Sequence, residues 1–177
     1  MSLPSSNFSA HNRPVTTPAI TTERLTLRPV SPEDAADLAD GGTGGLAWVD
    51  GGPFDGTRRA AGGLVRAAAV GVYDPAWGMY ALIRNEDGKA VGGMGFHGAP
   101  TGGRVEIGYD LAEPARGHGY ATEALHALTA RTLQHPDVAT VLAKTEPENK
   151  PSRSVLTRSG FRHTAEENGL LVYELTP

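Results

Sequence analysis

The sequence has no cysteine, only three lysines and few aromatic residues, which make up 6% of its 177 positions. Without cysteine the chain has no disulfide, no thiolate zinc site and no cysteine nucleophile. No stretch approaches about 18 consecutive apolar residues, so we expect no membrane-spanning segment. The polar first residues also lack the apolar core of a secretory signal. A cytoplasmic protein is therefore the expectation.

Basic charge is sparse as well. The 16 basic residues form no dense run, and the formal net charge is −4. A mildly acidic chain without a basic stripe is a poor nucleic-acid binder. An apolar content of 39% is too high for a disordered chain. The length favours one domain, so we expect a flexible lead-in over residues 1–20 and a single domain over residues 21–177.

Glycine is abundant, with 23 residues, and nine of them lie between Gly41 and Gly63. Each glycine inside a helix costs about 1 kcal/mol relative to alanine, although a helix over residues 57–70 is possible. Trp48 and Phe54 are isolated apolar residues among these glycines. The glycines predict a mobile flap or a substrate-side loop, and residues 41–71 are expected to be a variable flap region.

Elsewhere the hydrophobic pattern is clearer. Residues 104–111 alternate, with Glu106 and Asp110 on one face and Tyr109 and Leu111 on the other. The order of elements predicts a mixed α/β domain with a mostly antiparallel sheet and one βαβ unit in its second half. Strands are expected at residues 24–30, 77–84, 89–97, 104–111, 138–145, 161–166 and 170–175, and helices at 31–40, 122–134 and 152–159.

A glycine-rich turn follows the strand that ends at Leu111 and opens a helix near Thr122. The start of a helix leaves backbone N–H groups unpaired at the positive end of the helix dipole. Together with glycines that let an anion approach, such a turn favours phosphate or pyrophosphate, and Arg116 adds a positive charge. A P-loop lysine is absent, and the dinucleotide fingerprint fails at Thr122. A glycine-rich helix start without a ligand is the alternative.

The surrounding residues carry a family resemblance. Residues 106–111, Pro114 and residues 116–125 closely resemble the coenzyme A-binding motif of the GNAT N-acetyltransferases, most of all their RimJ/RimL branch. The resemblance continues backward to residues 22–28 and forward through Asn149, Ser152, Val155 and residues 160–161. It implies a GNAT-like mixed sheet with helices on both faces, and a monomer or a homodimer.

The resemblance also implies where acetyl-CoA binds. Its pyrophosphate would lie on the N–H groups of residues 117–122, its pantetheine along residues 109–111, and its thioester carbonyl on a backbone N–H near Leu111. Asn149 and Ser152 match positions that contact the cofactor, or else they cap the following helix. The implied cofactor residues are Tyr109, Leu111, Arg116, Gly117, His118, Gly119, Tyr120, Ala121, Thr122, Asn149 and Ser152.

The implied reaction is transfer of an acetyl group from acetyl-CoA to a primary amine by direct attack in a ternary complex, without a metal. The acceptor is a protein N-terminal amine or a small-molecule amine. Because only a neutral amine attacks a thioester, a base is needed. Glu106 is the first candidate and His97 the second; the alternatives are a solvated acid or a partner of Arg104 for Glu106, and a surface residue for His97.

The proton donor for the leaving thiol is less clear from the sequence. Many GNAT enzymes have a tyrosine seven residues after the asparagine, and that position is Leu156 here. Ser152 is the candidate in its place. Trp48 and Phe54 either line the acceptor pocket or are surface residues. Three alternatives remain open: a non-catalytic CoA-binding or regulatory module, a succinyl-CoA-dependent N-acyltransferase, and an unrelated nucleotide-binding protein.

Overall fold

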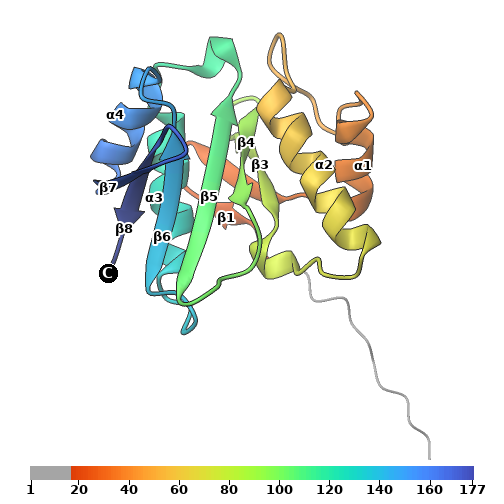
Figure 1. Cartoon of the computed structure of the whole chain (residues 1–177). Helices are drawn as coiled ribbons and strands as arrows, with labels where there is room; N and C mark the ends of the chain where they lie inside the picture. Colours follow the sequence, from red (N-terminus) through yellow and green to blue (C-terminus); the bar gives the residue numbers. More distant parts are fainter. Residues whose placement is uncertain (1–16) are drawn as a thin grey trace, which may run out of the picture.

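The computed structural model describes residues 17–177, which form one eight-stranded sheet and its covering helices (Figure 1). The strand order is β1-β2-β3-β4-β5-β6-β8-β7. The strands are β1 (Ile20–Thr21), β2 (Leu25–Pro29), β3 (Met79–Arg84), β4 (Ala90–Phe96), β5 (Arg104–Leu111), β6 (Thr140–Thr145), β7 (Arg162–Glu167) and β8 (Leu170–Leu175). The α-helices are α1 (Pro32–Ala39), α2 (Asp55–Ala69), α3 (Tyr120–Thr132) and α4 (Lys150–Arg158), with short 3₁₀ turns η1 (Pro75–Trp77) and η2 (Glu113–Ala115).

The sheet is antiparallel except at one junction. β1 to β5 form an antiparallel meander, and β6, β8 and β7 form a second antiparallel group. The two groups join where β5 pairs parallel with β6, with α3 as the crossover between them. Parallel neighbours need such a long crossover connection. The predicted mixed sheet with one βαβ unit is therefore confirmed.

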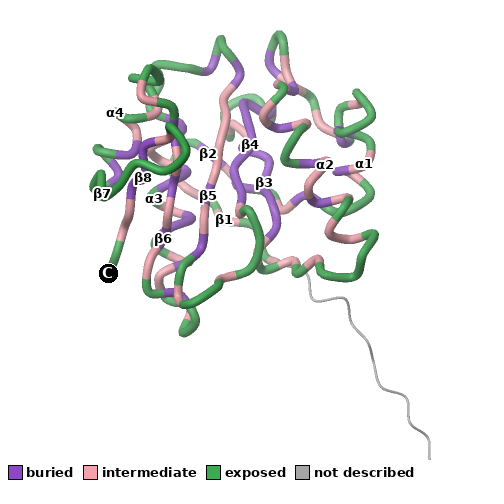
Figure 2. The backbone as a smooth tube through the Cα atoms, in the orientation of Figure 1, coloured by how far each residue is buried: buried purple, intermediate pink, exposed green. Residues whose placement is uncertain are grey.

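The helices cover both faces of the sheet, as the family resemblance implied. On β5, Val105 and Ile107 are buried in one cluster with Leu125 and Leu128 of α3. The opposite face of β5 meets α2, because Asp110 accepts hydrogen bonds from the backbone N–H and the hydroxyl of Thr57 (2.8 and 2.5 Å). Figure 2 shows β3 and β4 buried along most of their length between these layers.

Several predicted boundaries shift in the structure. Trp77 lies in η1 rather than at the start of a strand, because Asp74 caps this turn with its carboxylate. The last hairpin turns at Asn168 and Gly169, whose φ angles of 52° and 79° fit the two-residue turn that this dipeptide favours.

Of the lead-in expected at residues 1–20, residues 1–16 lie outside the described part. Thr17 donates a hydrogen bond to the carbonyl of Pro75 (2.8 Å), and Ile20 begins β1.

The segment 41–71, expected to be variable, contains the helix that the sequence allowed over residues 57–70. Its second half is α2, and its first half is bonded to β4, because Ala90 donates to the carbonyl of Ala47 (2.7 Å) and accepts from the N–H of Val49 (3.1 Å). Gly56 has a packing reason, since a Cβ there would lie 2.5 Å from the carboxylate of Asp110. At least this glycine reflects close approach of helix and sheet.

Candidate active site

The sheet opens where β5 and β6 part. Their parallel pairing ends at Glu106 and Leu142, although β5 continues to Leu111 and β6 to Thr145. The carbonyl of Glu106 and the N–H of Ala112 are bonded to His97 and Val91 on the β4 side. Because backbone groups alternate along a strand, those of Tyr109 and Leu111 turn the other way, toward β6. Unpaired backbone donors of β5 therefore face this opening.

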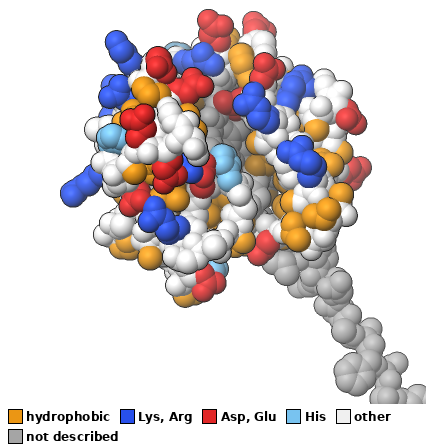
Figure 3. Space-filling view, in the orientation of Figure 1, with side chains coloured by type: hydrophobic (Ala, Val, Ile, Leu, Met, Phe, Trp, Pro, Cys, Tyr) orange, Lys and Arg blue, Asp and Glu red, His pale blue; other side chains and the backbone are white. Residues whose placement is uncertain are grey.

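A cavity of about 610 Å³ lies at the opening. In Figure 3 the surface is hollowed between the α1–α2 side of the molecule and the strands β5 and β6. The α2 side of the cavity is lined mainly by small and apolar residues, with Thr57 and the exposed Arg59 among them, and further polar groups lie where the strands part. The polar lining residues that matter below are His97, Tyr109, Asp110, Lys144 and Ser152, and the apolar ones include Leu64, Ala67, Val72, Trp77, Phe96 and Leu156.

The glycine-rich turn forms the start of α3, as the sequence predicts. Gly119 precedes the helix with a φ angle of 79°, a left-handed conformation that favours glycine. No side chain caps this helix. The first N–H groups of an uncapped helix point outward without an intrahelical partner, at the positive end of its dipole. The turn therefore has the geometry of an anion cradle.

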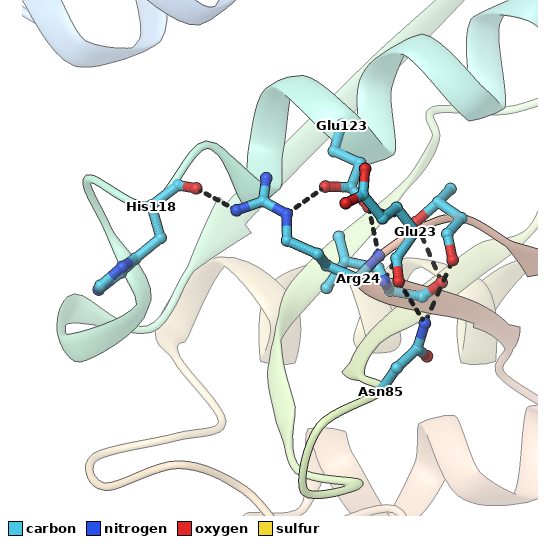
Figure 4. A network of polar contacts seen from close by, with 7 residues as sticks. Glu23, Arg24, Asn85, His118 and Glu123 are labelled. Carbon is cyan, nitrogen blue, oxygen red and sulfur yellow. Dashed lines mark hydrogen bonds and ion pairs between the residues drawn. The ribbon is translucent and has the colours of Figure 1, made fainter.

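Arg24 of β2's leading turn holds this cradle in place (Figure 4). Its guanidinium donates to the carbonyl of His118 (2.7 Å) and to the carboxylate of Glu123 (2.6 Å), and it lies 4.9 Å from the centre of the Tyr120 ring. Glu123 also accepts bonds from the hydroxyl of Thr22 and the N–H of Arg24. Arg24 thereby holds one carbonyl of the turn in place, while the N–H groups at the start of α3 stay available to a ligand.

The electrostatics of Glu123 follow from these contacts. Burial alone would raise the pKa of its carboxyl, but hydrogen bonds from Thr22 and Arg24 outweigh burial and hold the pKa below its ordinary value. The carboxylate is therefore charged at neutral pH and stays paired with Arg24. Both residues lie within the segments that resemble the family, but the sequence alone indicates a role for neither of them.

Arg116 lies at the mouth of the cradle. Its Nε donates to the carbonyl of Leu111 (3.2 Å), and its guanidinium lies 5.9 Å from the centre of the Phe54 ring. Phe54 therefore lies beside the cradle, and Trp48 packs against the α1–α2 cluster with its indole N–H bonded to the carbonyl of Thr43 (2.9 Å). Neither aromatic ring is among the described residues that line the cavity.

Glu106 and His97 meet on the α2 face of the sheet. His97 Nδ1 lies 3.0 Å from one carboxylate oxygen of Glu106, and the ammonium of Lys144 lies 3.6 Å from the other. The second ring nitrogen of His97 lies over Gly108, so close that a Cβ there would approach it to 2.7 Å. Arg104, the alternative partner of Glu106, pairs with Glu174 instead.

Lys144 links this pair to the end of the sheet. Its pKa is raised, first by the hydrogen bond to Glu167 and then by the negative charges of Glu106 and Glu167. The ammonium is therefore charged at neutral pH and balances the carboxylate of Glu106. No sequence pattern indicates a role for Lys144, because only the folded sheet places β6 beside β5 at this point.

On the opposite face of β5, Tyr109 reaches across the opening to α4. Its hydroxyl lies 3.1 Å from the Ser152 hydroxyl and donates to the Ser152 carbonyl (3.3 Å). Burial raises the pKa of the Tyr109 phenol. The hydrogen bond with the Ser152 side chain lowers this pKa, but by less than burial raises it. Asn149 caps α4, its side chain accepting a bond from the N–H of Ser152 (3.1 Å). Leu156 is buried and lines the same cavity.

Within residues 17–177 no group of three or more acidic or histidine side chains is arranged to hold a metal ion. None of the helices described there is both long and apolar enough to cross a membrane.

Sequence comparison decides the family. The model of the acetyltransferase (GNAT) domain matches residues 24–162, which include the cradle, the strand opening and both faces of β5. The chain belongs to the GNAT acetyltransferase family. It is therefore an acyltransferase, and the predicted family and the predicted enzyme class are confirmed.

Other members of the GNAT family resemble this chain along most of its length. An uncharacterized N-acetyltransferase p20 from Bacillus licheniformis is 31% identical over 159 residues, which are 85% of this chain and 83% of the relative. An acetyltransferase from Agrobacterium tumefaciens has a similar structure, with a TM-score of 0.66, 26% identity and coverage of 94% of this chain and 98% of that one.

Two further GNAT neighbours act on ribosomal proteins. A ribosomal-protein-S5-alanine acetyltransferase from Vibrio fischeri has a TM-score of 0.63 and 16% identity, and covers 90% of this chain and 97% of its own. A RimL ribosomal L7/L12 α-N-protein acetyltransferase in complex with coenzyme A has a TM-score of 0.61 and 20% identity. The match covers 90% of this chain and 98% of that one. At this identity they bear on the fold, which is the one that the resemblance to the RimJ/RimL branch predicts.

Proposed function

We propose that this GNAT acetyltransferase transfers an acetyl group from acetyl-CoA to a primary amine by direct attack in a ternary complex. The observation that carries the proposal is the uncapped, glycine-opened start of α3 beside the parting of β5 and β6. An uncapped helix start favours a pyrophosphate. The adjoining opening offers extended backbone groups to a pantetheine arm and to a thioester carbonyl.

The residues present fit acetyl-CoA. Gly117 has open space around it, so that a phosphate meets no side chain there. Arg116 supplies a positive charge at the cradle, and the N–H of Leu111 faces the opening where a thioester carbonyl needs a donor. Asn149 caps α4 and holds Ser152 on the far side of the opening from α2. When bound, acetyl-CoA supplies the activated acetyl group.

The base is the pair of His97 and Glu106. His97 lines the cavity, and its Nε2 lies over Gly108 with Nδ1 held by Glu106. His97 Nε2 accepts the proton of the amine, while Glu106 holds the ring and balances its positive charge, and Lys144 lies on the other side of the same carboxylate. In this arrangement His97 is the catalytic base and Glu106 is a positioning residue.

The acceptor is a protein N-terminal amine or a small-molecule amine. An amine acceptor is supported by the relative described as an N-acetyltransferase and by neighbours named for transfer to ribosomal proteins. The apolar α2 side of the cavity favours an acceptor that carries an apolar group next to its amine. Cytoplasmic location and a monomeric or homodimeric state stay predictions.

Thiol release from acetyl-CoA across a panel of amines and N-terminal peptides tests the proposal. We expect turnover with at least one acceptor, a loss of kcat/KM on the order of 10²-fold in His97→Gln, and a smaller loss in Glu106→Gln. Arg104→Gln, on the same strand but paired with Glu174, is the control and should keep its activity. Binding of CoA without turnover of any amine would support a non-catalytic module, and faster turnover with succinyl-CoA would make that the donor.

A further inference from the structure

The leaving thiol needs a proton, and the residue that many family members use for it is replaced here by Leu156, a buried side chain with no proton to give. The cavity nevertheless contains a phenolic hydroxyl on the same side of the sheet. Tyr109 comes from β5 rather than from α4, and its phenol reaches α4 at Ser152. Tyr109, Ser152 and Leu156 all line the one cavity at the strand opening.

We propose that Tyr109 is the proton donor to the departing thiolate sulfur and that Ser152 positions its hydroxyl. This inference rests on the proposed function. Ser152 contacts the phenolic oxygen twice, with its hydroxyl at 3.1 Å and its carbonyl at 3.3 Å. Two contacts from α4 therefore hold the Tyr109 hydroxyl in place. Ser152 is in turn fixed by the Asn149 cap.

The geometry separates the base from the acid. His97 and Glu106 lie on the α2 face of β5, and the side chain of Tyr109 lies on the α4 face. The strand opening lies between them. A thioester in this opening would therefore meet the amine from the α2 side and a proton donor from the α4 side, as a direct transfer requires.

The proton balance closes within these groups and water. The amine nitrogen forms a bond to the acetyl carbon, the carbon–sulfur bond breaks, and the electron pair stays on sulfur. Tyr109 gives its phenolic proton to that sulfur, which leaves as the thiol, and the proton lost by the amine goes to His97. Water then reprotonates Tyr109 through the Ser152 hydroxyl and takes the proton from His97.

The chemistry of the phenol suits this role. Burial raises the pKa of Tyr109, so the group stays protonated across the neutral range and has a proton to donate. A hydrogen bond from the Ser152 hydroxyl stabilises the phenolate that remains after transfer, since such a bond favours the charged form. Ser152 by itself is a far weaker acid than a phenol, which favours Tyr109 over the serine that the sequence suggested.

Steady-state kinetics of Tyr109→Phe with two kinds of donor test the inference. With acetyl-CoA we expect kcat to fall on the order of 10²-fold. With p-nitrophenyl acetate or S-phenyl thioacetate, whose leaving groups depart without a proton, we expect less than a twofold change. Tyr173→Phe, a buried tyrosine of β8 outside this cavity, is the matched control and should resemble wild type with every donor.

Two further measurements separate this role from a structural one. Calorimetric titration with CoA should give the same Kd for Tyr109→Phe and wild type, and Ser152→Ala should lower kcat only when Tyr109 is present. Unchanged kcat of Tyr109→Phe with acetyl-CoA would overturn the inference, as would an equal fall with all donors or a loss in Ser152→Ala that adds fully to that of Tyr109→Phe. Each of these results presupposes wild-type turnover, so a failure of the proposed function is seen first and separately.

Discussion

At the scale of single residues, several side chains around the site hold backbone groups in place. Arg24 and Glu123 fix the carbonyl of His118, and Asp110 fixes the first turn of α2 through Thr57. Arg24 and Glu123 are 99 residues apart in the sequence, and Thr57 and Asp110 are 53 residues apart. The bond from Arg24 to the carbonyl of His118 holds the turn that carries the N–H groups of the cradle.

The Glu123 carboxylate predicts a pH-dependent contribution to stability. A group whose pKa is lowered by folding contributes stability that is complete above its unfolded pKa, about 4.3 for Glu, and is lost as the pH falls through the folded value. The pKa of Glu123 is lowered by Thr22 and Arg24 despite its burial. We expect Glu123→Gln to cost about 1–2 kcal/mol at pH 7, and the cost to shrink below about pH 4.

Urea unfolding at pH 7, 5 and 3 measures this difference. Glu113→Gln is the control, because Glu113 is exposed in η2 and forms no ion pair with any of residues 17–177. It should unfold like wild type at each pH. A Glu123→Gln difference that stays constant from pH 7 to pH 3 would contradict the assigned ion pair.

At the scale of elements, the start of α3 is where backbone conformation and function coincide. Gly119 has a φ of 79°, and a Cβ there would also approach Arg24 to 3.4 Å. Gly119→Ala should cost about 1–2 kcal/mol for the left-handed backbone and raise the KM for acetyl-CoA severalfold, because the cradle N–H groups turn away.

Gly88→Ala is the matched control for this prediction. Gly88 has a similar φ of 70° in the turn between β3 and β4 and open space around it. It should lose comparable stability in thermal unfolding and keep the wild-type KM. Equal KM values for the two variants would mean that the start of α3 does not bind the donor.

The elements also define what the sequence could predict. β5 was predicted at its observed bounds, because strict alternation and flanking turns specify a half-buried strand. The conformation of residues 41–54 could not be predicted from a local pattern. Ala47 and Val49 in this stretch are bonded to Ala90, more than 40 residues away. For the same reason the contacts of Tyr109 with Ser152 and of Lys144 with Glu106 required the folded sheet.

At the scale of the whole molecule, one cavity lies between α2 and the parted strands. Its apolar α2 side is continuous with an exposed apolar edge at Val70 and Val72, which are 72% and 71% exposed. Val72 also lines the cavity. In the proposed function, the donor binds at the start of α3 and the acceptor on the α2 side of the cavity.

Filling the α2 side of the cavity should separate the two substrates. Ala67→Phe, which projects from α2 into the lining, is expected to raise the KM for the acceptor amine at least severalfold and leave the KM for acetyl-CoA within twofold. Ala69→Phe at the exposed end of the same helix is the control. A rise in the acetyl-CoA KM alone would reverse the assignment of the two sides.

A crystal structure of the chain with acetyl-CoA bound tests the whole arrangement most directly. We predict pyrophosphate oxygens within hydrogen-bond distance of the N–H groups of residues 117–122, and the thioester in the opening between β5 and β6. There its carbonyl should face the N–H of Leu111, its sulfur the Tyr109 hydroxyl, and the acceptor side His97. A pyrophosphate bound away from the start of α3, or a thioester outside the strand opening, would contradict the account.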